Sequence, residues 1–200
     1  MLILPQAVQD LAALFKQLPG IGPRSAERIA LHLVQEPPEK VRQLADTLAG
    51  AREKISACSL CGALTEQDPC SICTDSKRDP HILCVVETAL DVLRIERSGG
   101  YGGRYHVLGG KLSPINGVEP EDLRVKELES RIAGEGITEI IVALGTDVEG
   151  EATAYYLAQQ FQGKVARVSR LAYGIPAGTG IEFADQLTLS RAIAGRQKIE

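Results

Sequence analysis

Two close pairs of cysteines constrain this chain more than any other feature of its sequence. The pairs are Cys58-x-x-Cys61 and Cys70-x-x-Cys73, with eight residues between them. Each pair lets two thiolates bind one ion, and two pairs complete a tetrahedral shell that leaves no open position, as is typical of structural zinc. The surrounding residues 58–80 show almost no apolar periodicity, so a metal supplies stability that burial cannot. We therefore predict one structural zinc ion per chain.

Cysteine usage also indicates a compartment. The chain has five cysteines, and its start does not resemble a signal peptide. We expect the protein in a reducing cytoplasm, where paired cysteines are more often metal ligands than disulfides. Two disulfides or a thioredoxin-like redox pair remain alternatives. The fifth residue, Cys84, lies in the apolar run 82–86 and is predicted to be a buried thiol.

The composition is that of a soluble globular chain, and its net charge argues at first against DNA binding. The 200 residues are 44% hydrophobic and 24% charged, which suits one large domain or two small ones. No apolar run approaches the roughly 18 residues of a membrane span. The net charge is −4, whereas nucleic-acid binders are usually basic. The charge is uneven, however, because residues 1–57 carry +1, residues 58–80 carry −2 and residues 81–200 carry −3.

The first third of the chain is predicted to be helical. Apolar residues recur at helical spacing on both sides of a Pro- and Gly-rich break at 19–23, which indicates a helix, a tight hairpin and a second helix. A third helix is expected to follow Pro37-Pro38 and to run to about Lys54. The apolar positions are Val8, Leu11, Phe15, Leu18, Ala26, Ile29, Ala30 and Leu33 in the hairpin pair, then Val41, Leu44, Ala45 and Leu48.

The hairpin has the residues of a phosphate site. Gly20 and Gly22 allow positive φ and leave backbone amides unshielded, and Pro23 suits the first turn of a helix. Exposed N–H groups at a helix N-terminus favour a phosphate, and Arg24 and Arg28 lie on one face of that helix. The plain alternative is a Gly-rich turn with a solvated basic edge. The segment resembles the helix-hairpin-helix motif, so we predict contacts to the DNA backbone without base reading by Gly20, Gly22, Arg24 and Arg28.

From residue 81, short β-rich runs alternate with helical ones. This alternation predicts a parallel, twisted sheet covered on both faces. The expected strands are 82–86, 105–108, 140–144 and 165–168, and the expected helices are 89–95, 123–132 and 152–161. Residues 173–200 hold too few apolar side chains for a core of their own. We expect them to swap or dock, with 181–185 as an edge or swapped strand and a short helix near 187–193.

Acidic residues follow two of the expected strands. Glu87 comes after the first, and Asp147 and Glu149 come after the third. Carboxylates that converge at strand ends hold Mg²⁺ through oxygen ligands, and this arrangement resembles a Toprim domain. Catalytic Toprim domains carry Asp-x-Asp, whereas this chain has Asp147-Val148-Glu149, so we favour a structural role or weak Mg²⁺ binding over catalysis. The alternative function is a Mg²⁺-dependent Toprim nuclease or topoisomerase-like enzyme. The ordinary structural explanation is that Glu149 simply lies at the start of a helix, where acidic side chains complement the helix dipole.

Two other signals are weak. The run Gly109-Gly110-Lys111-Leu112 lacks the upstream glycine and the Ser or Thr of a phosphate-binding loop. The three histidines are scattered and have no paired nucleophile, so we expect ordinary surface or core roles for them. No nucleotide site is predicted from these residues.

The order of these motifs resembles the RecR family of bacterial recombination mediators along essentially the whole chain. The stretches that carry the resemblance are 18–30, 58–73, 84–87, 105–108, 112–118, 149–154, 169–176 and 188–190. The chain departs from the family pattern in loops, with Gly145-Thr146-Asp147 in place of Asn-Pro-Thr and Gly178-Thr179 in place of Gly-Gly.

The resemblance implies a non-enzymatic clamp in recombinational repair. Family members act with RecO and RecF to help RecA replace single-strand-binding protein on gapped DNA, and they form ring-like tetramers. We expect a cytoplasmic, nucleoid-associated protein with an α+β, multi-module fold. Its modules would be a DNA-binding and oligomerisation region (1–57), a zinc finger (58–80), a Toprim-like α/β domain (81–172) and an oligomerisation segment (173–200). On this reading Glu87, Asp147 and Glu149 would contact RecO.

Overall fold

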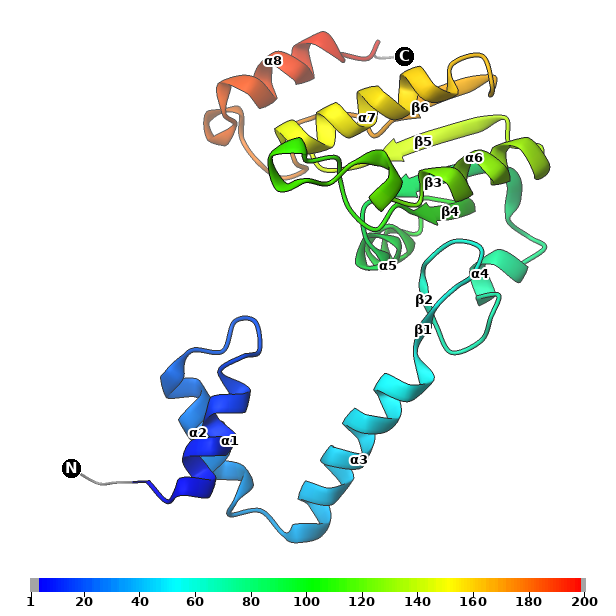
Figure 1. Ribbon diagram of the computed structural model, residues 1–200. Helices are drawn as coiled ribbons and strands as arrows, with labels where there is room; N and C mark the ends of the chain where they lie inside the picture. The colour runs from blue at the N-terminus through cyan, green and yellow to red at the C-terminus, as the bar shows by residue number, and fades with distance from the viewer. Residues whose placement is uncertain (1–3, 199–200) are drawn as a thin grey trace. The chain divides into compact units, whose positions relative to one another are not determined.

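The computed structural model describes residues 4–198 and divides into two compact units, with the boundary in the chain between Ile55 and Ser56. The first unit consists of helices α1 (Gln6–Phe15), α2 (Pro23–Leu33) and α3 (Pro38–Lys54) (Figure 1). Small and apolar side chains let α1 and α2 pack closely, with Val8, Ala12, Ala26 and Ala30 buried between them. The helix α3 buries none of its residues. The predicted helix, hairpin and helix are therefore present.

A four-stranded parallel sheet organises the second unit. The strands lie in the order β4-β3-β5-β6, and each pair runs parallel. Their bounds are Asp79–Val86 for β3, Gly103–Val107 for β4, Glu139–Ala143 for β5 and Arg167–Arg170 for β6. The last four residues of the central strand β3 are all buried, as expected of a strand covered on both faces. The predicted α/β fold with a parallel sheet is confirmed.

The two faces of the sheet pack against different partners. Leu83 and Val85 point to one face, where they join a core with α6 (Val125–Gly134) and α7 (Val148–Phe161). Residues of opposite parity in β3 point to the other face, which α5 (Ala89–Ser98) and the cysteine segment cover. This alternation follows from the two-residue period of a strand.

The cysteine segment folds as a small finger on that second face. Its elements are β1 (Ser56–Ala57) and β2 (Leu64–Thr65), which pair antiparallel, and the short helix α4 (Ser71–Thr74). All four paired cysteines belong to the same core cluster as Cys84, Val86 and Tyr105 of the sheet. The amide of Val107 also donates to the Cys61 carbonyl at 2.7 Å. The finger and the sheet therefore share one hydrophobic core.

Three single-turn helices and one longer helix complete the chain. They are η1 (Pro114–Asn116), η2 (Pro120–Asp122), η3 (Ile181–Phe183) and α8 (Gln186–Ala194). The strand predicted at 181–185 is wrong, because the Phe183 amide bonds back to Gly180 and Asp185 caps α8 through the Thr188 amide at 2.9 Å. These local hydrogen bonds satisfy the backbone without a neighbouring strand. Along residues 4–198, no helix combines the length and apolarity needed to cross a bilayer.

Candidate functional site

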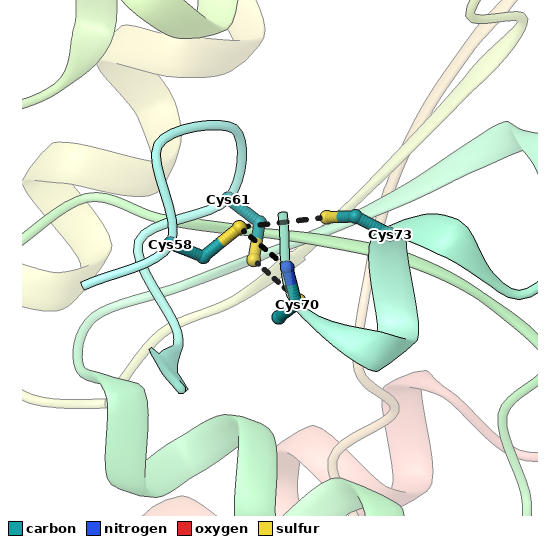
Figure 2. A group of neighbouring side chains, drawn as sticks. All are labelled: Cys58, Cys61, Cys70 and Cys73. Atoms are coloured by element: carbon teal, nitrogen blue, oxygen red, sulfur yellow. Dashed lines mark hydrogen bonds between the residues drawn. The ribbon is translucent and has the colours of Figure 1, made fainter. Parts of the chain in front are cut away.

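The four paired cysteines converge on one point (Figure 2). Their sulfur atoms all lie within 4.8 Å of one another, and all four residues are buried. The Sγ–Sγ separation is 4.0 Å between Cys58 and Cys73 and 3.6 Å between Cys61 and Cys70. A tetrahedral zinc ion with Zn–S bonds of about 2.3 Å requires sulfurs about 3.8 Å apart. The residues present therefore fit a zinc ion bound by four thiolates, and all of them are free thiols rather than disulfides.

Backbone geometry prepares the thiolates for a metal. The Ala63 amide donates to Cys61 Sγ at 3.4 Å, and the Cys70 amide donates to Cys58 Sγ at 3.3 Å. Such N–H donors stabilise negative sulfur. Gly62 makes the turn after Cys61 at φ +79°, and a Cβ there would lie 2.1 Å from Arg124 Nη1 and 3.1 Å from the Val107 side chain. The positive φ favours glycine at this position, and the close approach to Arg124 and Val107 adds to that preference.

The predicted DNA-contact residues surround the start of α2. Gly20 adopts φ +79°, as predicted, whereas Gly22 is extended at φ −81° and serves as the N-cap of the helix. No side chain caps that end, so the first amides of α2 lack an intrahelical or side-chain partner. Arg24 and Arg28 are exposed, and neither forms an ion pair with any residue of the described chain. The structure thus leaves two cations and a helix N-terminus open to solvent.

The predicted acidic cluster is arranged differently from a metal site. A lysine that sequence reasoning set aside, Lys111, places its Nζ 2.6 Å from Asp147 Oδ2 and 3.5 Å from Glu87 Oε2. The hydrogen bond from Lys111, together with the Gly150 amide, holds the pKa of Asp147 below its usual value. The same hydrogen bond raises the pKa of Lys111. Glu87 and Asp147 therefore share one cation from the protein itself, which offsets one of their two negative charges.

Glu149, the third predicted acidic residue, turns to other partners. Its Oε1 accepts a hydrogen bond from Ser113 Oγ and a longer one from Asn116 Nδ2 at 3.4 Å. Among residues 4–198, the four zinc-finger cysteines are the one group of three or more potential ligands that lie together. The convergence of three carboxylates on Mg²⁺ is therefore not supported. The fold joins Glu149 to the loop after β4, which sequence spacing alone did not indicate.

A second polar cluster, also missed from the sequence, ties the last helix to α7. Glu151 accepts hydrogen bonds from Tyr173 Oη and from Arg170 at 3.0 Å, and its carboxylate lies 3.3 Å from Arg191 of α8. The two guanidinium groups lie 4.4 and 4.5 Å from the Tyr173 ring centroid, which is cation–π distance. The hydrogen bonds from Tyr173 and Arg170 keep the pKa of Glu151 low.

Comparison with family models matches four consecutive parts of the chain. The matches are a RecR helix-hairpin-helix (residues 8–52), a RecR four-cysteine zinc finger domain (55–75), a Toprim domain (81–172) and a RecR C-terminal segment (174–197). Together with the clustered cysteines and the parallel sheet, these matches define a zinc-finger Toprim protein of DNA recombination.

Curated relatives name the family. The protein of Nocardioides sp. (strain ATCC BAA-499 / JS614) is 50% identical over 193 residues, which cover 96% of this chain and 97% of that protein. Those of Streptomyces coelicolor and Moorella thermoacetica are 48% and 45% identical, with at least 96% of either chain covered. All three are called "Recombination protein RecR". This chain belongs to the RecR family, and the resemblance stated from its sequence is confirmed.

Proposed function

We propose that this protein is a non-catalytic mediator of recombinational repair, which clamps gapped DNA and assists RecA loading together with RecO and RecF. The observation that carries the DNA-binding part is the open N-terminus of α2, with Arg24 and Arg28 exposed and unpaired within residues 4–198. Helix N-termini and arginines bind phosphates without reading bases. Because the DNA it binds would be chromosomal, we expect the protein in the bacterial cytoplasm, at the nucleoid.

Assembly into a ring increases the number of phosphate contacts. One chain contributes only two arginines at the hairpin, whereas a homotetramer would gather about eight around its opening, similar to the roughly 6–10 contacts that give strong salt dependence. Apolar side chains that the single chain leaves exposed support contacts with further copies. They are Leu44 and Leu48 of α3, and Leu171, Ile181, Phe183, Leu187 and Ile193 near the C-terminus. Where such side chains are contiguous, they mark contacts between proteins, and we propose contacts between copies of the chain for these residues.

The edge of the sheet that carries Glu87, Asp147 and Glu149 is the proposed contact for RecO. Two aliphatic side chains beside these carboxylates are almost fully exposed, namely Ile115 at 98% and Val148 at 86%. The Ser113–Val118 bridge and the hydrogen bond from Ser113 to Glu149 hold the Ile115 loop in place. A partner that fits this surface offers an apolar pocket with basic side chains around it. Reversing the acidic charges should weaken RecO binding, and unchanged affinity would refute this assignment.

Bound zinc has a structural role in this proposal. One ion per chain would be held by Cys58, Cys61, Cys70 and Cys73, with no open position for a substrate or water. Its chemistry is limited to fixing the two cysteine pairs. The chain's own residues then hold the finger on the sheet, through the Val107 amide and through Arg124, which donates to the Ser59 carbonyl at 3.2 Å.

The experiment that tests DNA binding replaces the two hairpin arginines. Arg24→Ala with Arg28→Ala should lower affinity for gapped DNA about tenfold or more and make its salt dependence less steep, because each arginine bound to a phosphate releases counterions. Gel shifts over a salt series measure both quantities. Arg42→Ala, on the exposed surface of α3, is the control with one charge removed elsewhere in the same unit. Wild-type affinity and slope in the double variant would contradict the proposal.

The enzyme alternative is tested separately. A Mg²⁺-dependent nuclease or topoisomerase would use Glu87, Asp147 and Glu149, yet Lys111 already pairs with the first two. We expect no turnover when the protein is incubated with supercoiled, linear or gapped DNA in Mg²⁺. Cleavage or relaxation that Glu87→Gln abolishes would establish the enzyme instead.

A further inference from the structure

Lys111 lies where an open α/β sheet normally binds a ligand. The carboxyl ends of parallel strands meet at this edge, and carboxylates there usually hold a hard cation such as Mg²⁺. In this chain the ammonium group of Lys111 occupies the space between Glu87 Oε2 and Asp147 Oδ2, at 3.5 and 2.6 Å. The Lys111 side chain is only 16% exposed, so it is packed at this edge rather than extended into water.

Two further carboxylate oxygens near Lys111, one of Asp147 and one of Glu149, also have partners. Asp147 Oδ1 accepts from the Gly150 amide at 2.7 Å and thereby caps α7. Glu149 accepts from Ser113 and Asn116 and does not join the pair. A magnesium ion requires near-octahedral oxygen coordination at about 2.1 Å. Here it would have to displace an ammonium group and take Asp147 oxygens already engaged in hydrogen bonds, while its charge would repel Lys111.

We propose that Lys111 is a built-in cation that replaces the divalent metal at this edge of the sheet. It offsets one of the two negative charges of Glu87 and Asp147 and occupies the space between their oxygens, so the wild-type site binds no divalent ion. Removal of the ammonium group leaves two carboxylates facing each other, and this pair then recruits a metal. Lys111 therefore acts as a positioning residue for the acidic edge, and the proposal holds whether or not that edge contacts RecO.

The test is a gain of metal binding. Mn²⁺ serves as the probe because electron paramagnetic resonance reports its free concentration directly, and thiolate sites prefer zinc to Mn²⁺, so the finger keeps its ion. Lys111→Met retains the aliphatic stem and should bind Mn²⁺ at least about tenfold more tightly than wild type, because an opposing unit charge has been removed. Adding Glu87→Gln to Lys111→Met should abolish that gain, and Lys111→Arg should behave as wild type.

A matched control separates this effect from overall charge. Lys164 forms a similar pair with Glu129, at 2.6 Å, elsewhere on the same unit. Lys164→Met changes the net charge by the same amount and should leave Mn²⁺ binding unchanged. Circular dichroism and zinc content check that each variant is folded and loaded, and Lys111→Gln replaces Lys111→Met if the latter does not fold. Two results would overturn the proposal: wild-type Mn²⁺ binding in a folded Lys111→Met or Lys111→Gln protein, or binding by the wild type that Glu87→Gln removes.

Discussion

At the scale of single residues, two buried cysteines lie in different environments, and we expect their substitution to have opposite effects on zinc content. Cys61 belongs to the four-sulfur cluster, whereas Cys84 is a separate thiol of strand β3, and burial raises its pKa to about 12. The first is expected to be a metal ligand. The second behaves as a small apolar side chain that does not ionise near neutral pH.

Cys61→Ser should release the zinc and strongly destabilise the second unit. Structural zinc binding in small fingers is worth about 10–16 kcal/mol, and the finger shares its core with the sheet, so we expect a loss of several kcal/mol in the free energy of unfolding. Elemental analysis and thermal unfolding measure the two effects. The control Cys84→Ala removes a buried sulfur outside the cluster and should keep one zinc per chain at a cost of about 1–2 kcal/mol. Equal zinc content and stability in Cys61→Ser and wild type would exclude the structural role.

A second residue-scale prediction concerns His106. Its imidazole is fully buried, and desolvation, with smaller contributions from Arg131 and Arg124, lowers its pKa to about 4. The unfolded chain protonates this group near pH 6.5. As the pH falls from about 6.5 to about 4, the unfolded state therefore gains a proton that the folded state does not, and stability decreases by up to roughly 3 kcal/mol.

His106→Gln should remove this part of the pH dependence. The free energy of unfolding, measured by urea titration at pH 7 and pH 5, should fall less steeply in the variant than in wild type. Comparing the two proteins at each pH cancels any contribution from zinc release. Parallel pH profiles would show that the imidazole is not the group responsible.

At the scale of elements, the start of α7 depends on one close approach. Gly150 lies in its first turn, and a Cβ there would lie 2.0 Å from the Gly145 carbonyl oxygen. A backbone oxygen cannot rotate away, so the turn that carries Asp147 would have to move. The glycine is present because of this contact, even though glycine normally weakens a helix.

Gly150→Ala is therefore expected to destabilise the second unit by about 1–3 kcal/mol, as overpacking of a close contact does. Gly134→Ala is the matched control, because a Cβ at the exposed end of α6 meets nothing within 4 Å. That substitution should be neutral or stabilising by up to about 1 kcal/mol. Urea unfolding of both variants measures the contrast, and a harmless Gly150→Ala would contradict the close packing.

The elements could be predicted from the sequence wherever local pattern decides them. Helical spacing and strand alternation indicated the hairpin and the parallel sheet, and the paired spacing of cysteines indicated the finger. The start of α7 lies earlier than the predicted residue 152, because Asp147 caps it through the Gly150 amide. Lys111 was missed because its partner Asp147 lies 36 residues away, and only the fold brings them together. The roles of Arg24 and Arg28 in DNA binding stay predictions.

At the scale of the whole molecule, our proposal places assembly and partner binding on different exposed apolar residues. Phe183 is 77% exposed near the C-terminus, whereas Ile115 is 98% exposed in the single-turn helix η1 of the Toprim domain. Neither contributes to the core of the single chain, so replacing either with serine should leave its folding intact. The two variants therefore serve as controls for each other.

Phe183→Ser should lower the oligomeric mass measured by light scattering and, in consequence, weaken binding to gapped DNA. Ile115→Ser should keep the mass and weaken RecO binding about five- to tenfold, the usual effect of truncating a moderately important interface side chain. A normal mass in Phe183→Ser would remove that residue from the assembly surface. Full RecO affinity in Ile115→Ser would remove that residue from the partner surface.

The shared core of finger and sheet also limits which chimeric proteins can be built from this chain and its relatives. The zinc-finger and Toprim matches end and begin at residues 75 and 81, which suggests a convenient splice point between two modules. That splice would separate Cys61 from the Val107 amide and Ser59 from Arg124. A chimera that takes its finger from a relative must therefore also take the facing surface of the sheet. The finger and the sheet surface that it covers form one packed unit, although they match two family models.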